Sequence, residues 1–197
     1  MNLLTLYEIL SEILPFTIFL LIINLIYKHK IDVKTNILLI LFALYIIGVF
    51  YFTGSGTIWD GLFKNFEIRF DQINLVPFKN QINIIEYILN IILFMPFGFL
   101  TPFICKKELN LYKIIIKGFS FSLLIELSQL LNNRSFDIND LILNTLGAVI
   151  GYVLFKLCKK NFKLKQESQM NFELIIILII FISKFIFFNE YLILNYI

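Results

Sequence analysis

The sequence places polar side chains in three series within otherwise apolar segments. In each series the residues recur at steps of three or four, which puts them on one face of a helix. The three series are Asn83, Glu86 and Asn90; Ser122, Glu126, Gln129 and Asn133; and Asp137, Asp140 and Asn144. Carboxylates can act as general acids or bases or can hold a cation through oxygen. Polar side chains are costly within a membrane, so each series requires an explanation.

Two arginines lie close to these series in the sequence, and all the other basic residues among the 17 are lysines. Arg69 and Arg134 occur in short stretches rich in Asn, Asp and Phe. The planar guanidinium group suits a carboxylate or a phosphate. We therefore predict one ligand-binding cluster, made of Arg69, Asn74, Asn90, Glu126, Gln129, Arg134, Asp137, Asp140 and Asn144. The alternative is a network that only bonds the helices to one another.

The composition identifies the class of protein that holds this cluster. Of the 197 residues, 59% are apolar and 16% are charged, and the mean hydropathy is +0.84. Soluble domains average about 45–50% apolar and about 25% charged residues. These values exclude a soluble globular enzyme and predict an integral membrane protein.

Six windows are long and apolar enough to cross about 30 Å of hydrocarbon. They lie near residues 9–27, 35–52, 84–104, 114–131, 141–157 and 172–188. The predicted fold is therefore an all-α, polytopic transmembrane helical bundle of about six spans in the cell membrane. The first window begins beside Glu8 and Glu12 and contains Pro15, so its start is the hardest to place.

The lysines predict the orientation of the bundle. They gather in the connections that follow the first, third and fifth windows, and such connections face the cytoplasm. Both termini are then predicted to be extracytoplasmic. At 1.5 Å per residue, Asn90, Glu126 and Asn144 fall within about 5–10 Å of the outer boundary, which places the cluster on the outer side.

The loop between the second and third windows has aromatic residues at helical spacing, at Trp59, Phe63, Phe66 and Phe70. A separate polar stripe runs through Asp60, Lys64, Glu67 and Asp71. This pattern predicts an outward amphipathic helix in the headgroup plane. A helix packed on top of the bundle is the alternative.

Small residues and prolines predict how the helices pack. Gly147 and Gly151 form a GxxxG step, which indicates tight packing within the bundle or, as the alternative, a homodimer. Pro96 and Gly98 are expected to break the third span, because proline has no backbone N–H for the carbonyl near Ile92.

Three blocks of the sequence resemble the VanZ-like membrane proteins, a family named after an accessory protein of glycopeptide resistance associated with teicoplanin. The blocks are RFDQINLVPF at 69–78, NIILFMPFG at 90–98, and IELSQLLNNRSFDINDLILNTLGAVIG at 125–151. The resemblance implies a four-helix domain whose signature includes most of the predicted cluster. Together with the GxxxG step it gives a structural set of Pro77, Phe78, Pro96, Gly98, Gly147 and Gly151. Many relatives have Gly where this chain has Asn133, which affects the turn before Arg134.

The predicted domains follow from the resemblance. Residues 1–34 form an extra N-terminal transmembrane helix and a cytoplasmic turn, and residues 35–158 form the VanZ-like transmembrane domain. Residues 159–197 form a basic linker and an extra C-terminal transmembrane helix.

Three functions fit this sequence. The first is envelope-associated binding of a lipid headgroup, a cell-wall precursor or a glycopeptide such as teicoplanin. The second is an intramembrane enzyme acting on a lipid-linked phosphate or acyl group, with Glu126 as general base and Asp137 and Asp140 as acid or metal ligands. The third is a small transporter or flippase. Membrane lipids are the expected partners, with no nucleic acid. No cofactor or metal is expected, the alternative being a divalent cation at Asp137, Asp140 and Glu126.

Overall fold

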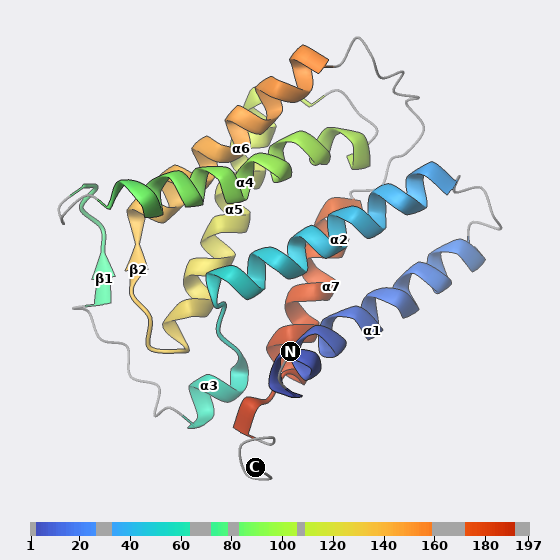
Figure 1. Cartoon of the computed structure of the whole chain (residues 1–197), viewed down its shortest axis with the longest axis horizontal. Coiled ribbons are helices and arrows are strands. Elements are labelled where there is room, and N and C mark those ends of the chain that lie inside the picture. Colours follow the sequence, from blue (N-terminus) through green and yellow to red (C-terminus); the bar gives the residue numbers. More distant parts are fainter. Residues whose placement is uncertain are drawn as a thin grey trace. The chain divides into compact units, whose positions relative to one another are not determined.

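The computed structural model describes residues 3–26, 33–63, 72–78, 83–105, 109–158 and 172–191. Arg69, Phe66, Phe70 and the polar residues at 64, 67 and 71 lie outside the described residues. Figure 1 shows the helices and two short strands. The helices are α1 (Leu3–Ile26), α2 (Val33–Thr53), α3 (Ile58–Phe63), α4 (Ile84–Cys105), α5 (Leu111–Leu130), α6 (Ile138–Cys158) and α7 (Phe172–Phe187), and the strands are β1 (Ile73–Asn74) and β2 (Phe136–Asp137).

The all-α fold predicted from the apolar windows is confirmed, with one long helix at each window. Four of the described helices, α1, α2, α4 and α6, are long and apolar enough to cross a membrane. Helix α5 carries three charged side chains, Lys113, Lys117 and Glu126, and α7 has only 16 residues, or about 24 Å. Of the six predicted spans, four are therefore supported by the length and composition of the described helices.

The first helix begins earlier than its apolar window. The window starts near residue 9, whereas α1 starts at Leu3 and includes Glu8, Glu12 and Pro15. The two carboxylates do not end the helix, because both are buried and Lys184 of α7 pairs with Glu8.

The chain divides into two compact units. One contains Met1–Glu67, Leu131–Asn133 and Phe172–Ile197, and we call it the α1–α2–α7 unit. The other contains Ile68–Leu130 and Arg134–Asn171, and we call it the α4–α5–α6 unit. The domain boundaries drawn from the sequence after residues 34 and 158 stay a prediction.

In the α4–α5–α6 unit, α4 and α6 approach each other closely along small residues. A Cβ atom added at Gly151 would lie 1.9 Å from the Met95 carbonyl oxygen, and one at Gly147 would lie 2.2 Å from that of Ile91. The predicted tight packing at the GxxxG step is therefore present within the chain. A homodimer through the same glycines stays a prediction.

The expected break in the third span does not occur. Helix α4 continues from Ile84 to Cys105 with both Pro96 and Pro102 inside it. The glycine beside the proline has a packing role instead, since a Cβ atom at Gly98 would lie 1.8 Å from the Ala148 carbonyl oxygen of α6.

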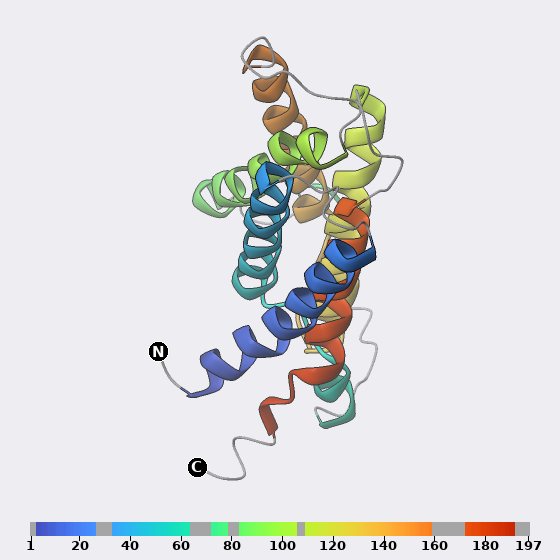
Figure 2. The same cartoon turned by 90° about the vertical axis from the view of Figure 1, so that its right-hand side faces the viewer.

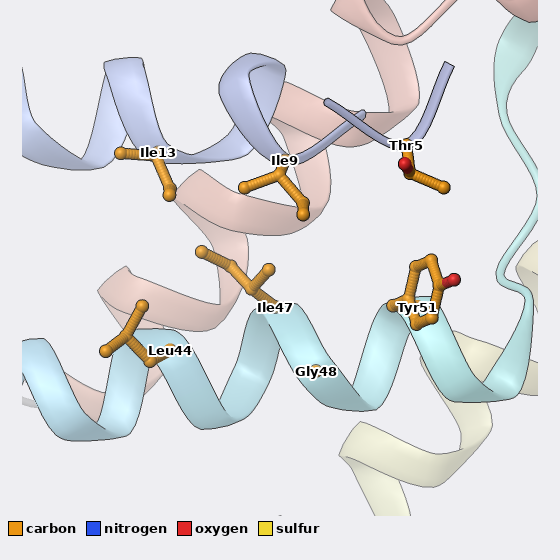
Figure 3. Close-up of a pocket in the computed structure, with 7 residues that line it drawn as sticks. All are labelled: Thr5, Ile9, Ile13, Leu44, Ile47, Gly48 and Tyr51. Atoms are coloured by element: carbon orange, nitrogen blue, oxygen red, sulfur yellow. The ribbon is translucent and has the colours of Figure 1, made fainter. Parts of the chain in front are cut away.

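In the α1–α2–α7 unit, α7 packs against both α1 and α2, and Figures 1 and 2 show α1 crossing α7. Fully buried Phe42, Ile46 and Phe50 of α2 form the core with Ile176 and Ile180 of α7. A pocket of about 480 Å³ lies between α1 and α2 (Figure 3). Its lining residues are Thr5, Ile9, Ile13, Leu44, Ile47, Gly48 and Tyr51.

The described part of the aromatic loop packs on the end of α7. The Trp59 Nε1–H donates to the Ile186 carbonyl at 2.7 Å, and the rings of Phe63 and Tyr191 lie 4.7 Å apart. Asp60, predicted on a solvated polar stripe, is buried and accepts hydrogen bonds from the Thr57 N–H and hydroxyl, each at 2.8 Å. These residues follow the alternative of a helix packed on the bundle, and Asp60 caps its start.

Candidate ligand-binding site

The site is built around the start of α6, where two distant segments pair. Strands β1 and β2 are parallel, with Asn74 opposite Asp137. The Asn74 Nδ2 donates a hydrogen bond of 3.1 Å to the Asp137 Oδ1. This pairing explains why the sequence needs an amide at 74 and a carboxylate at 137. It fixes the segment 72–78 beside the first residues of α6.

Asp137 also begins α6. Its Oδ1 accepts the Asn139 N–H at 2.9 Å, in the manner of an N-cap residue that satisfies a free donor at a helix start. Asn139 in turn accepts the Phe78 N–H at 2.9 Å through its Oδ1. Phe78 has a φ of 57°, an uncommon value for a bulky residue, and this hydrogen bond helps to hold it.

Asn139 is a residue that the periodic pattern missed. Its side chain is buried, with 2% exposed, and lies off the face defined by Asp137, Asp140 and Asn144. The available signal was the density of polar residues, since three of the four positions at 137–140 are Asp or Asn.

Glu126 links α5 to the start of α6 through Asp137. Its side chain is buried, with 1% of the residue exposed, and its Oε2 accepts the Asp137 N–H at 3.0 Å. The Glu126 carboxylate of α5 thus satisfies a backbone donor that precedes α6. The hydrogen bond is charge-assisted when Glu126 is ionised.

Asp140 and Asn144 continue the site along α6. The Asn90 Nδ2 of α4 donates to the Asp140 Oδ1 at 2.6 Å, and the Asn144 Nδ2 donates to the Ser122 Oγ of α5 at 2.9 Å. Asp140 lies in the first turn of α6, where the helix dipole favours a negative charge. The Asn144 Oδ1 is buried and accepts no hydrogen bond from the described residues.

Arg134 lies at the exposed side of this arrangement. Its backbone N–H donates to the Gln129 carbonyl at 3.1 Å, which closes the turn at the end of α5. Asn133 has a φ of 59°, a left-handed conformation that Asn adopts more readily than most residues, so an Asn fits this turn. The Arg134 side chain is exposed.

The structure thus brings together six of the nine residues predicted to bind a ligand. Gln129 is buried on the same α5 face and Arg134 follows it, while Arg69 is outside the described residues. The six residues are Asn74, Asn90, Glu126, Asp137, Asp140 and Asn144.

The structural set of the sequence analysis has two kinds of role. The glycines permit the contact of α4 with α6, and Phe78 is bonded to Asn139, as described above. Pro77 precedes Phe78 in an exposed turn. Within the described ranges, no three His, Cys, Asp or Glu side chains gather closely enough to hold a metal ion. The divalent cation at Asp137, Asp140 and Glu126 stays a prediction without support from this geometry.

Comparison with known proteins identifies the region that contains the site. A family model described as VanZ/LLP1 matches residues 37–159. A curated relative, Protein VanZ of Enterococcus faecium, is 29% identical over 154 residues, which cover 71% of this chain and 89% of the relative. No solved structure matches the chain. Every residue of the candidate site lies within the matched region.

Proposed function

This chain belongs to the VanZ/LLP1 family of membrane proteins, and from that premise we propose that it binds an amphiphile of the cell envelope at the α4–α5–α6 site. The ligand class is a molecule with an apolar part in the membrane and a polar head that carries an anionic group. A lipid headgroup, a lipid-linked cell-wall precursor and a glycopeptide such as teicoplanin all have this chemistry.

The observation that carries the proposal is the arrangement of donors and acceptors. Arg134 follows the end of α5 with its side chain exposed, and a guanidinium group suits an anionic group. Deeper in the unit, the buried Asn144 Oδ1 is an acceptor with no donor among the described residues. A polar head with both an anionic group and a hydrogen-bond donor would match these two features. A network that only joined helices would have no reason to leave a buried acceptor unpaired.

The proposed side of the membrane is the outer one. The lysine-rich connections predict that both termini and the start of α6 face away from the cytoplasm. A tag at the N-terminus should then be cleaved by protease added to intact protoplasts, whereas a tag in the lysine-rich connection at 159–165 should be cleaved only after lysis.

The test of function is the susceptibility of a sensitive Gram-positive host to teicoplanin and vancomycin. The host expresses the wild type, Arg134→Ala, Arg134→Lys or Glu126→Gln, with membrane levels matched by immunoblot. We expect the wild type to raise the teicoplanin threshold and Arg134→Ala to abolish the increase. Arg134→Lys keeps the charge without the planar fork, so an intermediate threshold is expected.

Glu126→Gln separates binding from catalysis. Glutamine keeps an oxygen that can accept the Asp137 N–H, so a binding site should retain most of the effect. A general base would lose its function with this substitution. A wild type that changes neither threshold, or an Arg134→Ala variant as active as the wild type, would contradict the proposed binding function.

A further inference from the structure

A second buried polar cluster lies in the α1–α2–α7 unit and shares no residue with the candidate site. The Lys184 Nζ of α7 donates to the Glu8 Oε1 of α1 at 2.6 Å and to the Phe50 carbonyl of α2 at 3.1 Å. The Glu12 Oε1 is 3.9 Å from the same nitrogen. All three charged residues are buried, with 9% of Glu8, 1% of Glu12 and 2% of Lys184 exposed.

The position of the ammonium group is fixed by the contacts at the end of α7. The Tyr7 hydroxyl donates to the Phe187 carbonyl at 2.5 Å, and the Trp59 Nε1–H donates to the Ile186 carbonyl at 2.7 Å. These bonds satisfy carbonyls that a helix end leaves without partners. Lys184 is therefore held facing α1 in the last turn of α7.

The two carboxylates are not equivalent. Glu8 has a short ion pair with Lys184, and 12% of its side chain is exposed. Neither carboxylate oxygen of Glu12 has a hydrogen-bond partner among the described residues, and 1% of its side chain is exposed. The ion pair between the Lys184 Nζ and the Glu12 Oε1, at 3.9 Å, is too long for a hydrogen bond. It therefore does not replace the hydrogen bonds that a buried carboxylate requires.

Charge balance then assigns a proton to the cluster. One ammonium group faces two carboxylates. Helix α2 contributes only the Phe50 carbonyl to this cluster, because its lysine, Lys34, is at the opposite end of the helix. On α7, Glu173 is 11 residues from Lys184, or about 16 Å along the axis. The Asp60 carboxylate of α3 already accepts hydrogen bonds from the Thr57 N–H and hydroxyl. No described residue therefore neutralises a second ionised carboxylate, and a buried unpaired charge is strongly unfavourable.

We propose that Glu8, Glu12 and Lys184 form a proton-binding site, with the proton on Glu12 and Glu8 ionised. When the Glu12 O–H bond breaks, the proton passes to water and the remaining carboxylate takes Lys184 as its partner. The Nζ has to approach Glu12 by about 1 Å to form a hydrogen bond. Lys184 is thus able to exchange between two carboxylates one turn apart on α1.

The same unit contains the pocket between α1 and α2. Figure 3 shows Thr5, Ile9 and Ile13 of α1 facing Leu44, Ile47 and Tyr51 of α2. The two glutamates alternate with these residues along the same turns of α1. Thr5 and Tyr51 are the two lining residues that carry hydroxyl groups.

The test is infrared spectroscopy of the full-length protein in detergent and D2O at neutral pH. The wild type minus Glu12→Gln difference spectrum should contain a protonated-carboxyl carbonyl band equal to one group. Glu8→Gln should lose the same band, because Lys184 then has only Glu12 to neutralise and Glu12 ionises. Glu86→Gln, on the exposed start of α4, is the matched control and should leave the band unchanged.

The absence of the band from the wild type minus Glu12→Gln spectrum would overturn the proposal, because Glu12 would then be ionised. Thermal unfolding gives an independent reading. Glutamine resembles a protonated glutamic acid, so Glu12→Gln should unfold within about 2 °C of the wild type, a shift expected for a near-neutral substitution. A Glu12→Gln chain that fails to fold while Glu12→Asp folds would also contradict the assignment.

Discussion

The two units bury carboxylates by different means. In the α4–α5–α6 unit, Glu126 and Asp137 accept backbone N–H groups, and Asp140 accepts an amide from Asn90. In the α1–α2–α7 unit, Glu8 and Glu12 face a single ammonium group. The first arrangement uses backbone and amide donors, and the side chain of the nearby Arg134 is exposed. In the second arrangement the cation, Lys184, is buried and pairs with Glu8.

This difference indicates what each cluster can do. Carboxylates satisfied by backbone and amide donors need no cation to complete their hydrogen bonds, and the exposed guanidinium group of Arg134 suits an anionic group. Carboxylates that compete for one lysine need a proton to balance their charge. The first cluster therefore suits recognition, and the second suits proton binding.

Removal of the internal cation should have the largest effect. Lys184→Met leaves Glu8 without its ion pair, and breaking a buried pair by removing one partner costs about 3–5 kcal/mol. We expect little folded protein by fluorescence-detected size exclusion in detergent. Lys156→Met is the matched control, since Lys156 is exposed in the last turn of α6. Equal yields for the two variants would show that the ion pair contributes little.

The next largest effect compares one glycine from each unit. Gly151→Ala places a Cβ atom 1.9 Å from the Met95 carbonyl oxygen, and such overpacking costs about 1–3 kcal/mol. Gly48→Ala meets nothing within 4 Å and should gain up to about 1 kcal/mol from helix propensity. Thermal unfolding in one detergent should therefore shift the two melting temperatures in opposite directions. Equal shifts would contradict the close contact of α4 with α6.

A smaller effect is expected at the start of α6. Asp137→Ala removes the N-cap and the acceptor for Asn74, at a cost of about 0.5–2 kcal/mol. Asp137→Asn keeps the oxygen acceptor and should unfold near the wild-type temperature. If both variants are equally destabilised, the negative charge of Asp137 matters more than its cap geometry.

The smallest effect on stability is expected for the Ser122→Ala, Asn144→Leu double substitution. It removes both partners of one hydrogen bond together with a buried acceptor that lacks a donor, which is close to neutral for stability. The same variant should lose the protection against teicoplanin that we propose for the wild type. A large loss of stability with full protection would instead identify the pair as part of the helix packing alone.

Periodicity was sufficient to find most of the candidate site because helix geometry fixes its spacing. Steps of three and four along α5 and α6 placed Glu126, Asp137, Asp140 and Asn144 on facing surfaces. The residues that share one face of a helix can therefore be predicted from the sequence.

Contacts made by irregular segments could not be predicted in the same way. Asn139 is bonded to Phe78, 61 residues earlier, and the partner lies in a turn without periodicity. The spacing predicts Asp60 on a polar stripe, yet its carboxylate is buried and accepts a hydrogen bond from the Thr57 N–H. The apolar windows also misplaced the start of α1, because hydropathy penalises Glu8 and Glu12 without regard to a partner 172 or more residues away.

The most direct test of the account is ligand-induced stabilisation of the purified protein. A ligand that binds only the folded state raises the melting temperature by mass action. Teicoplanin and phosphatidylglycerol are added separately to the wild type and to Arg134→Ala in the same detergent. The account predicts that at least one probe raises the melting temperature of the wild type and that Arg134→Ala loses this shift. No shift with either probe, or an equal shift in the variant, would contradict binding at the α4–α5–α6 site.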